Sequence, residues 1–101
     1  MQVQRPLNSR EEFVARELVV ALRSEVRSTG EAAWKDLDAV LTAHRRFGAY
    51  TRAEAVAAVR HGFYRGNFRF DLFFTLDATR GDGYRCDIIL RPHLCTNRRG
   101  E

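Results

Sequence analysis

Hydrophobic residues in the first part of the chain recur at three- and four-residue spacing, which is the period of an amphipathic helix. Ser9 and Glu12 have the spacing of a capping box, and Gly30 supplies a stop signal. We therefore expect a first helix from about Arg10 to Ser28. Its buried stripe comprises Val14, Leu18, Ala21, Leu22 and Val26. Arginines and glutamates alternate on the other side, as is typical of a solvated face.

The same signals predict two further helices. Ser28 and Glu31 have capping-box spacing and open a second helix that ends at Gly48. Thr51 and Glu54 open a short alanine-rich third helix, which Gly62 closes. The apolar stripe of the second helix comprises Ala33, Trp34, Leu37, Val40, Leu41 and His44, and we place Trp34 and His44 in the core or at its margin.

The period changes to two in the last third of the chain, which indicates β-strands. Even-numbered positions are apolar from Phe68 to Leu76 and again from Tyr84 to Leu90, and residues 78–83 have turn chemistry. We expect an antiparallel hairpin. In the register that we infer, Leu72, Phe74 and Leu76 face Leu90, Ile88 and Cys86, while Asp71, Phe73 and Asp77 face Arg91, Ile89 and Arg85.

A hairpin alone is marginally stable in water, so its even face has to lie on the helices. The expected fold is therefore a single two-layer α+β domain over residues 1–101, with three N-terminal helices packed on a C-terminal hairpin. Residues 1–8 and 95–101 lack periodicity and are expected to be mobile tails.

The order helix, helix, short helix and hairpin resembles a winged helix-turn-helix, although no family signature accompanies it. The resemblance implies that the third helix enters the major groove of DNA and that Arg80, at the hairpin tip, approaches a phosphate or the minor groove. The helix would present Arg52, Arg60 and His61.

Charge is concentrated in the middle of the chain. The chain carries a net charge of +4, and residues 43–69 contain six arginines and one carboxylate, Glu54, interleaved with aromatic residues. Guanidinium groups among rings suit a surface that binds phosphates and stacks on bases. The leading hypothesis is a small, basic, non-enzymatic module that binds nucleic acid, DNA or RNA. Its candidate binding residues are Arg45, Arg46, Arg52, Arg60, His61, Arg65, Arg69 and Arg80.

Two alternatives remain open. Phe73 and Ile89 fall on the outer face of the hairpin, where N-terminal residues or a second copy of the chain would cover them. They suggest an interaction module, either a homodimer or an accessory or inhibitor protein that docks on an acidic partner. His61, with Tyr64 and Arg65, could instead support acid-base cleavage of RNA, as in small ribonuclease toxins.

Other classes of function find no support in the sequence. Cys86, His93 and Cys95 lack the paired short spacings of structural zinc sites, so we expect no metal and no disulfide framework. No phosphate-binding glycine loop or other cofactor motif occurs, and we expect no cofactor. Charges interrupt every apolar stretch of the first thirty residues, so we expect no membrane association and a cytoplasmic location.

Overall fold

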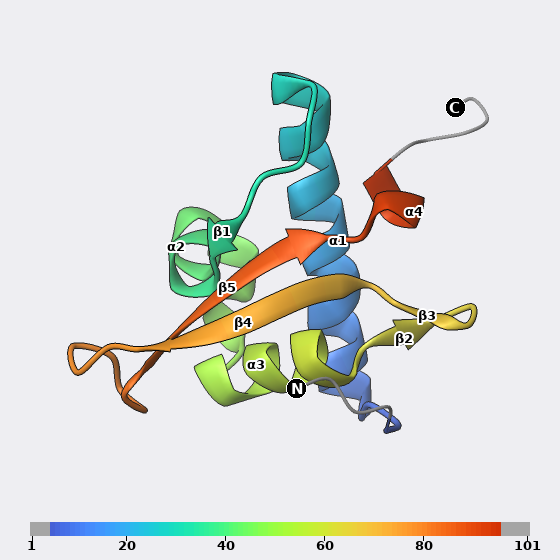
Figure 1. Cartoon of the computed structure of the whole chain (residues 1–101). Coiled ribbons are helices and arrows are strands. Elements are labelled where there is room, and N and C mark those ends of the chain that lie inside the picture. Colours follow the sequence, from blue (N-terminus) through green and yellow to red (C-terminus); the bar gives the residue numbers. More distant parts are fainter. Residues whose placement is uncertain (1–4, 96–101) are drawn as a thin grey trace.

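The computed structural model describes residues 5–95, which form an α+β fold with helices first and the main strands last (Figure 1). Strands β1, β5 and β4 form an antiparallel sheet in that order, and β2 pairs with β3 in a small separate sheet. In chain order the elements are α1 (Ser9–Thr29), β1 (Lys35–Asp36), α2 (Leu37–Ala43), the 3-10 helix η1 (Arg45–Ala49), α3 (Arg52–His61), β2 (Phe63–Tyr64), β3 (Asn67–Phe68), β4 (Phe70–Leu76), β5 (Tyr84–Leu90) and α4 (Pro92–Cys95).

The first helix is confirmed, but its capping residues lie one position earlier than predicted. The Asn8 side chain accepts from the Glu11 amide at 2.8 Å, and Glu11 accepts from the Asn8 amide at 3.1 Å. Both capping boxes fit the sequence equally well, because Asn and Ser are similarly good caps. The shift leaves Glu12 free to bind other groups. At the other end Gly30 adopts φ 92°, the left-handed conformation of a helix stop.

The predicted second helix is wrong in its first part. Ser28 lies inside α1, and Lys35 and Asp36 pair with Ile88 and Asp87 of β5 before α2 begins. The Asp36 side chain caps α2 by accepting from the Asp38 amide at 3.1 Å. Trp34 is consequently 48% exposed rather than in the core. The pairing of β1 with β5 joins segments about fifty residues apart, so no local pattern could reveal it.

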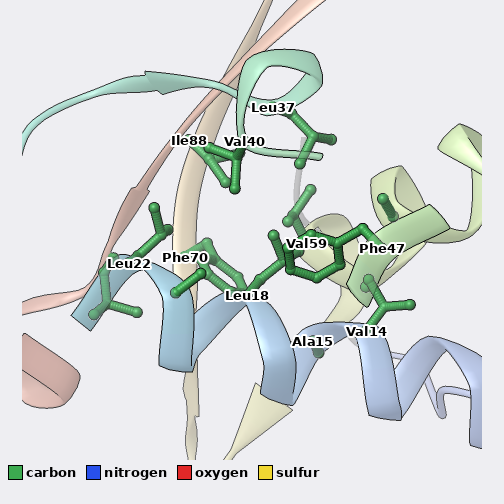
Figure 2. Close-up of a cluster of buried hydrophobic side chains, with 14 of the residues drawn as sticks. Val14, Ala15, Leu18, Leu22, Leu37, Val40, Phe47, Val59, Phe70 and Ile88 are labelled. Carbon is green, nitrogen blue, oxygen red and sulfur yellow. The ribbon is translucent and has the colours of Figure 1, made fainter. Parts of the chain in front are cut away.

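The core forms where α1, α2 and α3 meet the even-numbered face of the hairpin. Leu18 of α1, Phe70 of β4 and Ile88 of β5 are fully buried, and Figure 2 shows them converging with side chains of the other helices. Burying one such side chain stabilises the fold by about 1.5–3 kcal/mol. The apolar stripe of α1 thus holds the sheet in place.

The hairpin is confirmed, with a register two residues away from the predicted one. Leu72 faces Ile88, and Phe74 faces Cys86. On the outer face Asp71 lies opposite Ile89 and Phe73 opposite Asp87, while Asp77 closes the turn through a 2.8 Å bond from its amide to the Gly83 carbonyl. A shift of two leaves every side chain on its predicted face, so the alternation cannot choose between the registers. The conformation of the turn, in which Gly83 has φ 85°, determines the register instead.

Part of each predicted tail is ordered. Arg5 forms an ion pair with Glu11 at 3.2 Å, and Leu7 packs against the core. Cys95 is the last residue of α4. The remaining residues of the predicted tails, 1–4 and 96–101, lie outside the described residues.

The outer face of the sheet carries an aromatic pair. Phe73, at 47% exposure, packs edge-on against Trp34 with ring centroids 4.9 Å apart, and Ile89 beside them is half-buried. In Figure 1 this face lies in front of the helices, and no described helix covers it.

Candidate functional site

A basic hollow lies between α1, the β2–β3 hairpin and α4. Its volume is about 320 Å³. On the α1 side, Arg16, Val19 and Arg23 recur at three- and four-residue spacing, which places them on one helix face. The other lining residues are Tyr64, Arg69 and Leu94.

Arg69 forms the floor of the hollow. Its side chain is almost completely buried, and its guanidinium binds both carboxylate oxygens of Glu12, at 2.7 and 3.3 Å. The same carboxylate accepts from Arg16 Nε at 3.0 Å. Partial burial alone would raise the pKa of Glu12, but the hydrogen bonds and charges of Arg69 and Arg16 outweigh it and lower that pKa. Glu12 therefore stays ionised and fixes two arginines in place.

Tyr64 lies at the rim of the hollow, beside two guanidinium groups. The Cζ atoms of Arg65 and Arg69 lie 5.3 and 5.4 Å from the centroid of its ring, within range of cation–π attraction. Tyr64 is 41% exposed, so part of the residue remains open to a ligand. Arg23 lies across the hollow, where its Nε donates to the Leu94 carbonyl at 2.9 Å.

The turn between β2 and β3 holds Arg65 in an unfavourable backbone conformation. Arg65 has φ 50° and Gly66 has φ 85°, as a two-residue turn of type I′ requires. The left-handed region costs a residue with a side chain about 1–2 kcal/mol. Strained residues of this kind concentrate at binding sites, where the strain positions a side chain. Here it directs Arg65 onto the ring of Tyr64.

The hollow also accounts for the surplus charge of the described chain. Residues 5–95 contain fifteen Arg and Lys residues and twelve Asp and Glu residues, a net charge of +3. Four arginines and Glu12 give the hollow the same net charge of +3. The arginines are Arg16, Arg23, Arg65 and Arg69.

At the hairpin tip and the start of α3, which a winged helix-turn-helix would present to DNA, carboxylates outnumber arginines. Arg80, at the hairpin tip, binds Asp36, Asp38 and Asp77 at 2.8, 2.7 and 3.1 Å. Arg52 binds Asp38 at 2.8 Å and Asp82 at 2.6 Å. Two guanidinium groups thus meet four carboxylates, and this cluster of six groups carries a net charge of −2.

Three of these carboxylates have lowered pKa values that favour their charged form. The pKa of Asp36 is lowered chiefly by its hydrogen bond from Arg80. The pKa of Asp77 is lowered by the Thr79 side chain, and that of Asp82 by the backbone amide of Tyr84. At neutral pH Asp36, Asp77 and Asp82 therefore remain anionic beside the two arginines.

The structure disperses the eight predicted binding residues. Arg65 and Arg69 meet at Tyr64, while Arg45 and Arg46 lie on η1, where Arg46 binds Glu17 at 2.9 Å. Arg52 and Arg80 belong to the acidic cluster described above. Arg60 lies over the ring of Phe74 at 5.9 Å, and His61 lines a different hollow of about 400 Å³ with Glu12 and Phe63.

The sequence pattern did not identify the two arginines that α1 contributes to the hollow. Arg16 and Arg23 were assigned to a solvated face of the first helix. Their common face with Val19 was visible in the spacing, but the hairpin and the short α4 that complete the hollow come from residues 63–95. Only the tertiary packing shows that these arginines face a tyrosine.

Comparison with known proteins supplies no further information: no protein-family model, no curated protein and no solved structure matches this chain. Within residues 5–95, no group of three or more His, Cys, Asp or Glu residues is placed to hold a metal ion. None of the helices over the same range combines the length and the apolar character needed to cross a membrane.

Proposed function

We propose that this protein is a small module that associates with single-stranded nucleic acid through the basic hollow. The observation that carries the proposal is a hollow lined by three arginines and one partly exposed tyrosine, with a fourth arginine, Arg65, against the same ring; together with Glu12 these groups have a net charge of +3. Phosphate contacts supply most of the affinity of such proteins, and aromatic rings stack on bases without strong sequence preference. The site would work in the cytoplasm on DNA or RNA.

The hollow matches the chemistry of a nucleotide in size as well as in charge. Its volume of about 320 Å³ lies at the lower end of the range of small-ligand sites, about 300–1,000 Å³. A phosphate would lie between Arg16 and Arg23, beside the buried Arg69–Glu12 pair, while an unpaired base would stack on Tyr64. Bases inside a duplex do not offer their faces to a side chain, so a single strand is favoured.

The order of elements also fits a winged helix-turn-helix, with α2 and α3 preceding the β4–β5 hairpin. In that arrangement α3 and the hairpin tip would approach the duplex. The four carboxylates around Arg52 and Arg80 would repel phosphates there. We therefore place binding at the hollow and assign Arg80 and Arg52 a structural role.

Charge reversal tests the proposal. We expect Arg23→Glu combined with Arg65→Glu to weaken binding of a labelled single-stranded oligonucleotide by about tenfold or more at low salt, because both lost cations face the same ligand. The measurement is a fluorescence-anisotropy titration with DNA and RNA oligonucleotides.

The matched control reverses Arg45 and Arg46, which changes the net charge by the same amount outside the hollow. We expect this control to bind nearly as well as the wild type. Equal losses in the two variants would show that only overall charge matters, and would refute the assignment of the site.

A different observation favours the alternative function, protein interaction. The exposed Trp34 and Phe73 form an apolar face with Ile89 on the open side of the sheet. Large exposed aromatic groups of this kind mark interaction surfaces.

A further inference from the structure

Strand β4 lies at the edge of the three-stranded sheet, and the phase of its hydrogen bonds shows which groups it leaves unpaired. The ladder is flanked by bonds from the Arg91 amide to the Arg69 carbonyl at 2.9 Å and from the Asp77 amide to the Gly83 carbonyl at 2.8 Å. In an antiparallel pair, hydrogen-bonded positions alternate along the strand. The odd residues of β4 thus turn their backbone groups toward β5.

The even-numbered residues of β4 direct their backbone groups to the free edge of the sheet. Leu72, Phe74 and Leu76 direct both N–H and C=O away from β5, and no described backbone or side-chain group bonds to them. Three alternate residues with free donors and acceptors form a template for a further antiparallel strand.

β4 lacks the residues that usually prevent an edge strand from pairing with another chain. β4 reads FDLFFTL, with no proline or lysine and with one charge, Asp71, which Arg91 neutralises at 2.9 Å. Leu76 is 78% exposed and Phe73 is 47% exposed. Natural edge strands are normally protected by lysine, proline, bulges or covering elements.

We propose that a second copy of this chain occupies the edge, with the two β4 strands paired antiparallel about a two-fold axis. An isologous interface brings identical groups together, so it requires a strand that does not repel itself. β4 meets this requirement because its single carboxylate is already paired. The pairing joins the two sheets into one of six strands, in which Phe73 extends the apolar outer face and Leu76 lies against the partner's strand.

The test measures the mass of the free protein and the exposure of its amides. By analytical ultracentrifugation at rising concentration, we expect the wild type to shift from the monomer mass of 11.6 kDa to twice that value. The variant Phe73→Lys with Leu76→Lys should remain monomeric, because lysine at an edge opposes pairing. Val20→Lys, at a residue on α1 that is also about half exposed, is the matched control and should still dimerise.

Amide hydrogen exchange distinguishes edge pairing from other modes of association. The amides of Leu72, Phe74 and Leu76 should exchange rapidly in dilute protein and slowly in the dimer, while circular dichroism verifies that each variant is folded. A wild type that stays monomeric at every concentration would overturn the proposal. A dimer in which these three amides stay unprotected would also overturn it, because the contact would then lie on another surface.

Discussion

Tyr64 is the residue whose surroundings most resemble a ligand site. The residue is partly exposed, yet two guanidinium groups lie against its ring and the tight turn after it restricts its motion. An exposed ring that is already positioned loses little conformational entropy when a base stacks on it. The side chain is thus preorganised for flat ligands.

Replacing Tyr64 therefore provides a residue-scale prediction. We expect Tyr64→Ala to weaken binding of single-stranded nucleic acid by about 1–3 kcal/mol, the usual contribution of one stacked base. Tyr64→Phe keeps the ring and should bind nearly as well as the wild type. Isothermal titration with one oligonucleotide compares the three proteins, and unchanged affinity in Tyr64→Ala would remove stacking from the account.

At the scale of elements, the junction between α3 and the β2–β3 hairpin determines the shape of the hollow. Gly62 closes α3, and its carbonyl accepts from the Arg69 amide at 3.1 Å. A Cβ atom at this position would collide with the Ala58 carbonyl oxygen and would contact the Arg69 guanidinium. Glycine is needed here for close approach, since its φ of −67° is open to any residue.

Gly62→Ala should consequently destabilise the fold by about 1–3 kcal/mol, as overpacking of a tight site does. Gly48→Ala is the control, because a Cβ atom there meets nothing within 4 Å. Urea unfolding followed by circular dichroism measures both variants. Equal stability of the two would mean that the junction tolerates the extra atom.

The elements that the sequence predicted well are those set by local patterns. The apolar stripe of α1, the capping box of α3 at Thr51 and Glu54, and the even face of the hairpin are all present in the structure. Strand β1 was missed because Lys35 and Asp36 have no strand pattern and become a strand only by pairing with β5. The hairpin register was missed because a shift of two preserves both faces.

The candidate site was harder to predict for a related reason. Arginines clustered in sequence became dispersed in space, since α1 and α2 supply the carboxylates that bind Arg46, Arg52 and Arg69. Whether an arginine is available to a ligand depends on such long-range partners. The composition gives the net charge of the chain, but it does not show which surface carries that charge.

At the scale of the whole molecule, ion pairs between arginines and carboxylates join elements that are distant in sequence. Arg10 of α1 binds Glu54 of α3 at 2.6 Å. The hydrogen bond from Arg10 and the capping bond from Thr51 lower the pKa of Glu54 from 4.5 to about 2. Ionised Glu54 therefore stabilises the fold above its unfolded-state pKa, and this contribution is lost as the pH falls toward 2.

Lowering the pH should therefore reduce the stability of the fold, in part through protonation of Glu54. We expect the urea midpoint to fall between pH 7 and pH 3, because Glu11, Glu12 and Asp36 also have lowered pKa values. Glu54→Gln should lower the midpoint at pH 7 and reduce its dependence on pH. Glu31→Gln, at an exposed residue with no ion pair among residues 5–95, should leave both unchanged. A pH dependence that survives intact in Glu54→Gln would contradict this role.

The most direct test of the central claim is the salt dependence of affinity for a single-stranded oligonucleotide. Each neutralised phosphate contributes a slope of about −0.7 to the plot of log affinity against log salt concentration. Three net positive charges in the hollow therefore predict a slope of about −2 for the wild type, and the variant Arg23→Glu with Arg65→Glu, whose hollow has a net charge of −1, should show a slope near zero. A wild type that does not bind at low salt, or a variant that keeps the wild-type slope, would contradict the account.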